Sequence, residues 1–226
     1  MSDLPVPPTI AEIAPDGNLT PRQKRRFLIN MSLRKQKSGS GSSLEFLQRR
    51  TAMREWPDFR QLLQGIPWVI VGGVATRAYM PERLTKDIDI LVHKKDGAAL
   101  IQRLRQAGYS LISQLGVPGH LLQSPDGVEV DVLFGDMPWL EDALAQPSSD
   151  PAGYPVLDLP YLVLLKLQAM RPQDWADVTR MLGLATDEQL DRVREVVARY
   201  SLEDVDDLES LIYLGKRELE FPDDEE

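Results

Sequence analysis

The sequence contains no cysteine and only two histidines among its 226 residues. The lack of cysteine excludes disulfides and thiolate metal sites, and two imidazoles are too few for a typical zinc site. No apolar run approaches the roughly 20 residues that a membrane helix requires. The first residues include acids and prolines, whereas a secretory signal has a basic start and an apolar core. We therefore expect a cytoplasmic protein that binds no membrane.

Charge is unevenly distributed along the chain, although the net charge is −9. Residues 20–50 hold nine Lys or Arg and one acid, whereas residues 203–226 hold eleven acids and two basic residues. Each run could be a solvated segment. The basic run could instead bind phosphates, with RNA, including tRNA, as the expected partner. A third reading is that the two runs attract each other, within one chain or between two.

Composition predicts three parts of the chain. Residues 1–18 hold four prolines and show no periodicity, which predicts disorder, and a basic helix is predicted to start at Thr20-Pro21. The sequence SGSGSS at 38–43 is typical of a flexible linker. The expected parts are a disordered, basic arm with its linker (1–43), an α/β core (44–135) and a C-terminal helical region with an acidic tail (136–226).

The fold class expected is mixed α/β (α+β), a small sheet with flanking helices followed by a helical bundle. Strands are predicted where apolar residues alternate or run continuously between turn residues, and helices where apolar residues recur at helical spacing. The predicted strands are 67–71, 87–92 and the two arms of a hairpin, 120–123 and 128–134. The predicted helices are 43–56, 58–65, 74–80, 96–109, 159–170, 172–182, 186–200 and 205–219.

Acidic residues in two of these strands need an explanation. Asp87 and Asp89 are two positions apart in DIDILV, so both carboxylates lie on one side of an extended chain, and Asp131 sits in VEVDVLF. Burying such acids without a partner is costly, and a hard divalent cation such as magnesium removes that cost. The alternative is that the acids pair with nearby cations, of which Arg77, Arg83 and Lys86 are the candidates.

A glycine pair, Gly72-Gly73, follows the first predicted strand and precedes a predicted helix. Glycine allows backbone to approach a phosphate closely, and a helix start offers free N–H groups to it. Such a pair can equally be a packing or turn feature. Lys166 lies within an apolar helical run, and its side chain could contact a phosphate or extend to the rim of the bundle.

The order of these features resembles the nucleotidyltransferase superfamily, whose fold is similar to the DNA polymerase β palm. GGVATRAYMPERLTKDIDILV resembles its glycine and D-x-D motif, and Asp131 matches the third carboxylate. The chain is most similar to the minimal bacterial branch that includes the AbiEii-type toxins, over roughly residues 66–185. In that branch Arg83 and Thr85 would precede the metal ligands, and Lys166 would reach the nucleotide phosphates, followed by Arg171, Asp174 and Asp177.

The resemblance implies a function and a set of partners. Asp87, Asp89 and Asp131 would hold two magnesium ions and catalyse transfer, while Gly72, Gly73, Arg83, Thr85 and Lys166 would bind the nucleoside triphosphate, ATP among the candidates. The acceptor would be a hydroxyl, at an RNA or tRNA 3′ end or on a protein. The chain could be the toxin of a toxin–antitoxin pair, with an antitoxin as partner. The alternatives are an enzyme that modifies a small-molecule antibiotic, or a nucleotide-binding module without activity.

Overall fold

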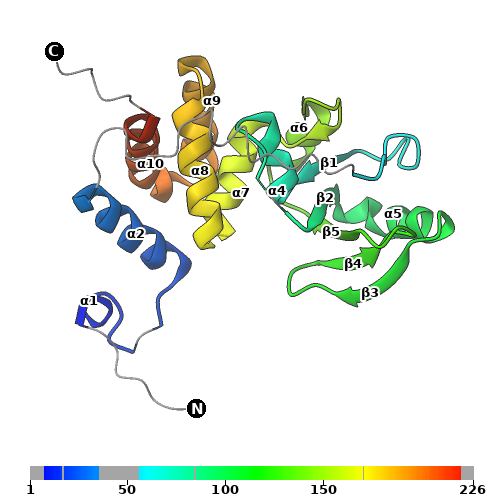
Figure 1. Ribbon diagram of the computed structural model, residues 1–226, viewed down its shortest axis with the longest axis horizontal. Helices are drawn as coiled ribbons and strands as arrows, with labels where there is room; N and C mark the ends of the chain where they lie inside the picture. The colour runs from blue at the N-terminus through cyan, green and yellow to red at the C-terminus, as the bar shows by residue number, and fades with distance from the viewer. Residues whose placement is uncertain (1–7, 17, 36–55, 84, 170, 220–226) are drawn as a thin grey trace. The chain divides into compact units, whose positions relative to one another are not determined.

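The computed structural model describes residues 8–16, 18–35, 56–83, 85–169 and 171–219 (Figure 1). The chain divides into two compact units. The sheet unit comprises Ser42–Leu162, and the helical unit comprises Met1–Gly41 together with Val163–Glu226. The division differs from the expected parts in two respects, because residues 136–162 belong with the sheet and the N-terminal segment belongs with the C-terminal helices. The expected division into 1–43, 44–135 and 136–226 stays a prediction.

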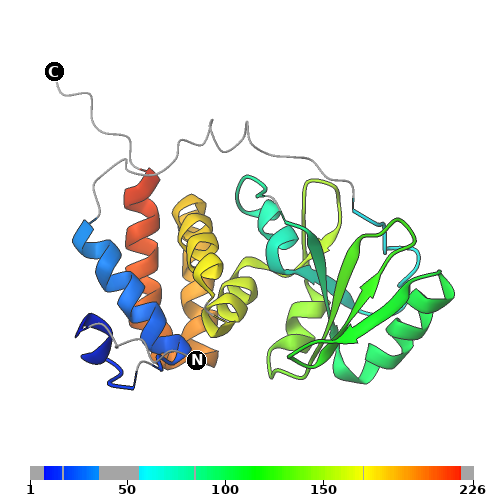
Figure 2. The same ribbon diagram turned by 60° about the horizontal axis from the view of Figure 1, so that its bottom comes forward.

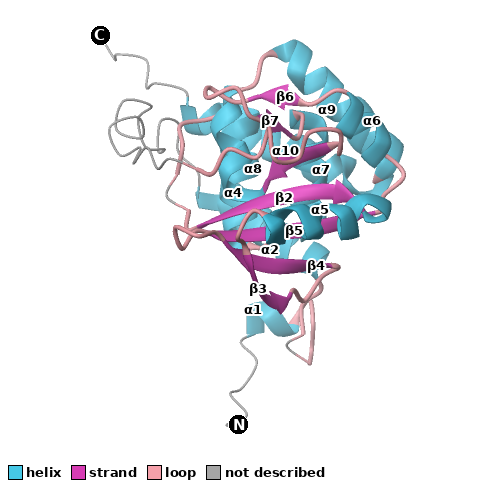
Figure 3. Cartoon of the chain, turned by 90° about the vertical axis from the view of Figure 1, so that its right-hand side faces the viewer, coloured by secondary structure: helices cyan, strands magenta, loops and turns pink. Residues whose placement is uncertain are grey.

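The sheet unit is built on seven strands in the order β3-β4-β5-β2-β1-β7-β6 (Figure 3). Pairing is mixed, since β2 and β5 are parallel, β1 and β7 are parallel, and the other neighbours are antiparallel. The bounds are β1 Trp68–Val71, β2 Asp87–His93, β3 Ser110–Gln114, β4 Gly119–Gln123, β5 Glu129–Gly135, β6 Ser148–Ser149 and β7 Pro155–Val156.

One face of the sheet is covered by helix α5 (Lys94–Gln106), which packs against β2 and β5. Ile88 and Ile90 on β2 are fully buried, as are Val130 and Val132 on β5. These residues alternate with the aspartates, so burying them against α5 directs the acids to the opposite face. The short helix α6 (Leu140–Ala145) packs toward the far end of that opposite face, against Gly135 and Leu91 of the strands.

The helical unit contains the long helices of the C-terminal half (Figure 2). Helix α7 (Leu159–Ala169) crosses the unit boundary, and α8 (Pro172–Leu184), α9 (Asp187–Tyr200), the 3₁₀ turn η2 (Leu202–Asp204) and α10 (Val205–Leu219) follow. Helix α9 starts with a capping box formed by Thr186 and Gln189. Helices α8 and α10 cross with backbone against backbone, since a Cβ on Gly215 would lie 2.1 Å from the Thr179 carbonyl oxygen.

The N-terminal basic segment forms helix α2 (Pro21–Lys35), and Thr20 caps it reciprocally with Gln23. Helix α2 packs on α10, as Figures 1 and 2 both show. Arg22, Arg25 and Arg26 bond to acidic residues or their backbone between 203 and 207. The third reading of the two charged runs, attraction within one chain, is therefore what the described residues show.

Several expected elements are placed differently in the structure. The helices expected after residue 159 are present, but 58–65 forms turns and 74–80 is replaced by α4 (Gly72–Ala75) and the 3₁₀ turn η1 (Thr76–Ala78). Strands β3, β6 and β7 were not expected, and a short helix, α1 (Pro8–Ala11), lies in the segment expected to be disordered. The predicted helix 43–56 falls almost wholly outside the described residues. Among the described residues, no helix is long and apolar enough to cross a bilayer.

Candidate active site

The three aspartates predicted as catalytic lie on one face of neighbouring strands. In the parallel pairing of β2 with β5, Asp89 is opposite Asp131, and Asp87 is opposite Glu129. Residues at matching positions of adjacent strands direct their side chains to the same side of a sheet, and adjacent strands are about 4.8 Å apart. The pairing therefore brings Asp131 to Asp89 although 41 residues of chain lie between them.

The glycine pair lies directly beside these acids. β1 pairs with β2 so that Val71, the residue before the pair, is opposite Asp89. Gly72 has φ of +65°, and a Cβ built on it would lie 1.9 Å from Oδ2 of Asp89. No side chain other than hydrogen fits between the Gly72 backbone and this carboxylate. The first glycine is thus required both by its left-handed conformation and by the closeness of Asp89.

Gly73 is covered by the two residues that precede the D-x-D pair. A Cβ on Gly73 would lie 2.9 Å from Nη2 of Arg83 and 3.1 Å from Oγ1 of Thr85. The Thr85 hydroxyl donates a hydrogen bond of 2.8 Å to Oδ1 of Asp87. The structure therefore gathers seven of the eight predicted site residues at one end of β1, β2 and β5. The eighth, Lys166, belongs to the helical unit.

Negative charge is concentrated on this face. Burial raises the pKa of Asp131 above its ordinary value, and the nearby negative charges of Asp87 and Glu129 raise it further. Glu129 is exposed and lies at the start of β5, so it contributes charge at the rim of the site. A carboxylate whose neighbours are other carboxylates favours either a proton or a cation, because each removes the repulsion.

The oxygen atoms that the three aspartates offer on this face suit a hard cation. The side chains of all three aspartates offer carboxylate oxygens, which are the ligands that magnesium prefers. Within the described parts of the chain, however, no three His, Asp or Glu side chains are grouped closely enough to hold a metal ion. The aspartates therefore share a face and a suitable chemistry, while their carboxylates are not gathered into a closed ligand set: Asp89 lies against Gly72, and Asp87 accepts a hydrogen bond from Thr85.

Arg77, one of the cations that could have neutralised the acids, has other partners. Its guanidinium pairs with Asp150, with Nε 2.6 Å from Oδ2, and its Nη1 lies 3.8 Å from Glu82. It also lies over the ring of Tyr154. Arg77 therefore ties η1 to the segment before β7. No pattern in the sequence indicates this pairing, because Asp150 is 73 residues away in an irregular region.

Lys166 is buried in the helical unit and does not extend to a rim. Its side chain is 3% exposed, and Nζ lies 2.9 Å from Asp174 and 2.8 Å from Asp177, both on α8. Burial by itself raises the pKa of Asp174, but the hydrogen bond from Arg171 and the positive charge of Lys166 outweigh it and hold that pKa below its ordinary value. The four residues that the resemblance grouped as a pattern thus form one charge-balanced cluster, two cations with two aspartates.

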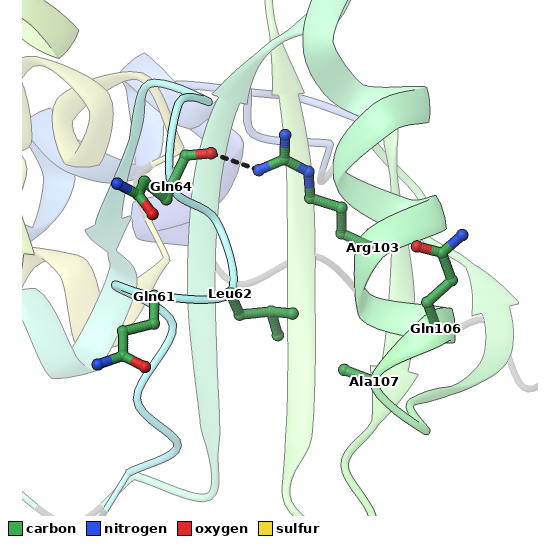
Figure 4. Close-up of a pocket in the computed structure, with 6 residues that line it drawn as sticks. All are labelled: Gln61, Leu62, Gln64, Arg103, Gln106 and Ala107. Atoms are coloured by element: carbon green, nitrogen blue, oxygen red, sulfur yellow. Dashed lines mark hydrogen bonds between the residues drawn. The ribbon is translucent and has the colours of Figure 1, made fainter.

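A hollow on the sheet unit is separate from these acids. It has a volume of about 510 Å³ and lies between the turns at 61–64 and helix α5 (Figure 4). Arg103 reaches across it to donate a hydrogen bond to the carbonyl oxygen of Gln64. Its lining holds glutamines, aliphatic side chains and this one charged residue, none of them an acid or a site residue. The hollow is open to solvent, and the chemistry of the strand acids is not in it.

Residues 54–225, about three quarters of the chain, match the family described as nucleotidyl transferase AbiEii toxin, Type IV TA system. The chain belongs to this family. It is therefore a nucleotidyltransferase, a transferase of a toxin–antitoxin family. The match covers every predicted site residue and leaves out α1 and α2. No protein with curated annotation is detectably similar in sequence.

Solved structures that resemble this AbiEii-family chain are nucleotidyltransferases of several kinds. A crystal structure of ANT(2″)-Ia with adenylyl-2″-tobramycin is 18% identical, with 68% of this chain and 91% of that chain covered and a TM-score of 0.38. The lincosamide antibiotic adenylyltransferase LnuA, bound to lincomycin, is 13% identical, with 61% and 89% covered and a TM-score of 0.38. The Thermotoga maritima CCA-adding enzyme with tRNA is 14% identical, with 76% and 50% covered and a TM-score of 0.35. Likeness at this level does not identify the substrate of this chain.

Proposed function

We propose that this AbiEii-family chain transfers a nucleoside monophosphate from a nucleoside triphosphate to an acceptor hydroxyl, with magnesium held by Asp87, Asp89 and Asp131. The observation that carries the proposal is the register of β2 and β5, which sets Asp89 opposite Asp131 next to Gly72. Three carboxylates beside a glycine pair have no evident role in stabilising the fold, because like charges repel. They suit a site that receives cations and phosphates together.

Each residue has a role that its position supports. The Gly72-Gly73 backbone, which has no side chain in the way, would contact the triphosphate, with Arg83 and Thr85 packed over Gly73. Asp87 and Asp89 would hold the metal ions, and Asp131 would hold the ion on the acceptor side. Two magnesium ions would supply Lewis-acid stabilisation of the attacking and leaving oxygens.

Lys166 would add positive charge for the phosphates, and to do so its ammonium group would have to give up its bonds to Asp174 and Asp177.

The reaction is a displacement at the α-phosphorus. The acceptor oxygen forms a bond to this phosphorus while the bond from phosphorus to the β-phosphate oxygen breaks, and pyrophosphate leaves. The proton of the acceptor hydroxyl passes to an Asp131 carboxylate oxygen, and from there to water. The strand face orients the acids for this step, and α5 keeps water from the opposite face by burying it.

The acceptor is left open among three classes: an RNA or tRNA 3′ end, a protein hydroxyl and a small molecule. RNA recruitment by the basic residues 20–50 also stays a prediction. In the described part of that segment, three arginines are already bonded to the acidic region 203–207, which reduces the charge available to a polyanion. A role as the toxin of a pair, restrained by an antitoxin, follows from the family and is proposed for this chain.

Labelled triphosphates test the proposal. The full chain is incubated with each α-labelled nucleoside triphosphate, magnesium and a cell lysate, and the label is then followed into RNA, protein and small molecules. We expect label transfer that EDTA and Asp87→Ala both abolish. Transfer that persists in Asp87→Ala and Asp131→Ala would contradict the site, and no transfer with any triphosphate would favour a binding module. Growth arrest by the parent chain but not by Asp87→Ala would support the toxin role.

A further inference from the structure

Arg25 of helix α2 is buried with every one of its guanidinium nitrogens bonded. Its side chain is 2% exposed. Nε donates to Oδ2 of Asp207 at 2.7 Å, Nη1 donates to the carbonyl oxygen of Leu167 at 2.8 Å, and Nη2 pairs with Asp204. The three acceptors belong to α10, α7 and η2. One side chain from α2 therefore connects three other elements of the helical unit.

The acceptors form a built socket for a guanidinium group. Asp204 and Asp207 are each 5% exposed. The second oxygen of Asp204 accepts from the Ser201 hydroxyl at 2.7 Å, and the second oxygen of Asp207 accepts from Nε of Arg26 at 3.2 Å. A buried carboxylate pair is unfavourable without a cation, and the planar fork of arginine reaches several acceptors that a lysine ammonium cannot reach at once.

The Leu167 carbonyl connects this socket to the residue next to Lys166. Leu167 lies in the last turn of α7, where carbonyl groups have no partner within the helix and where positive charge is favourable. Its neighbour Lys166 bonds to Asp174 and Asp177 of α8. The last turn of α7 is thus held on two sides, by the Lys166 side chain and by the Leu167 carbonyl.

The Arg25 cluster and the Lys166 cluster contain the same balance of charged groups. Arg25 and Arg26 face Asp204 and Asp207 in one cluster, and Lys166 and Arg171 face Asp174 and Asp177 in the other. Each cluster has two cations and two carboxylates. The second cluster lies entirely within the family match, whereas the first takes its cations from α2, which lies before it.

We propose that Arg25 is a positioning residue, and that α2 acts as a clamp that holds the last turn of α7 and with it Lys166. The proposal rests on the proposed function in one respect, the nucleotide contact of Lys166. Loss of Arg25 leaves Asp204 with no cation among its described bonds and frees the Leu167 carbonyl. The last turn of α7 then opens more often, and Lys166 is less often in place to bind a triphosphate.

The test compares Arg25→Ala and Arg25→Lys with Lys24→Ala in the full chain. Lys24 is the adjacent residue of α2 and its side chain is exposed, so it controls for removal of a positive charge from the helix. Amide hydrogen exchange is followed across all helices. In Arg25→Ala we expect exchange in the last turn of α7 to accelerate about tenfold, as for the loss of a charged hydrogen bond, with no change in the β-strands and none in Lys24→Ala.

Kinetics provide the second readout. Arg25→Ala should raise KM for the triphosphate about tenfold and leave kcat within about twofold, because the reacting groups of the sheet unit are unchanged. Arg25→Lys keeps the charge without the fork and should give an intermediate KM. If Arg25→Ala fails to fold, Arg25→Lys carries the test, and it should still accelerate exchange in the last turn of α7.

The outcomes separate the clamp from the proposed function. Faster exchange confined to α2 and α10, with α7 unchanged, would overturn the clamp. Faster exchange in α7 with an unchanged KM would overturn the positioning of Lys166. A parent chain with no transferase activity would count against the proposed function, and hydrogen exchange would still decide whether Arg25 holds α7.

Discussion

The Asp89 carboxylate occupies the space that a side chain on Gly72 would need. A Cβ on Gly72 would lie 1.9 Å from Oδ2 and 2.5 Å from Cγ of Asp89. Both residues are held in place by the sheet, since Val71, next to Gly72, is the antiparallel partner of Asp89. The positions of Gly72 and Asp89 therefore depend on each other, and a substitution at one residue should change the function of the other.

The first prediction concerns Gly72→Ala. We expect transferase activity to fall by about a hundredfold, because the new methyl group must displace the Asp89 carboxylate by an ångström or more. The left-handed backbone adds about 1–2 kcal/mol of destabilisation, measured by urea unfolding. Gly127→Ala is the matched control, since Gly127 has φ of +81° and a Cβ added to it would meet no atom within 4 Å. It should lose similar stability and keep its activity. Equal activity in the two variants would refute a role for this contact.

The second prediction concerns magnesium and Asp131. Magnesium should raise the melting temperature of the parent chain, because a ligand that binds only the folded state stabilises it. Asp131→Asn should reduce this shift and lower label transfer by about 10²–10⁴-fold, through loss of a ligand and of the proton acceptor. Glu129→Gln is the control, because Glu129 lies on the same face but is exposed. An undiminished magnesium shift in Asp131→Asn would exclude Asp131 as a ligand.

The third prediction concerns the pH dependence of the cluster around Lys166. The pKa of Asp174 is held below its ordinary value of 3.8 in the folded state. Its carboxylate therefore contributes stability in full above that value, and this contribution is lost as pH falls through the lower pKa of the folded state. The parent should be more stable than Asp174→Asn at pH 7, with a difference that shrinks below pH 3.8.

Chemical unfolding at a series of pH values measures this difference. Gln173→Ala is the control, because Gln173 is the exposed, uncharged neighbour of Asp174 on the same turn of α8. Its stability relative to the parent should not change with pH. A difference between parent and Asp174→Asn that stays constant down to pH 2 would mean that the ion pairs do not contribute.

The fourth prediction concerns the crossing of α8 and α10. Alanine is normally the better helix former by about 1 kcal/mol, so Gly215→Ala would stabilise an isolated helix. In the folded chain the added Cβ would lie 2.1 Å from the Thr179 carbonyl oxygen and 2.7 Å from the Gly183 nitrogen. We expect a net destabilisation of about 1–3 kcal/mol in thermal or urea unfolding. Gly116→Ala, at a position with open space, should cost little, and a stabilised Gly215→Ala would contradict the crossing.

Helix α2 shows what the charge pattern of a sequence predicts and what it leaves undecided. The sequence indicated a helix start at Thr20-Pro21 and an excess of positive charge, and the helix and its cap are present. Charge alone could not choose between RNA and the acidic C-terminal run as the partner. The packing of α2 on α10 brings the Arg25 guanidinium to three buried acceptors, two of them in the acidic run, while recruitment of RNA stays a prediction.

Local patterns in the sequence were enough to predict the alternation that puts Asp87 and Asp89 on one face, the hairpin that carries Asp131, and the helices from Leu159 onward. These are local properties, because side-chain periodicity and capping depend on residues a few positions apart. Tertiary structure decided the rest. The register of β2 with β5 sets Asp131 beside Asp89, and the approach of β1 makes Gly72 indispensable. Pairings such as Arg77 with Asp150 and Arg25 with Leu167 join residues 73 and 142 positions apart. No local pattern encodes such contacts, because they form only when distant elements pack and exclude water between them.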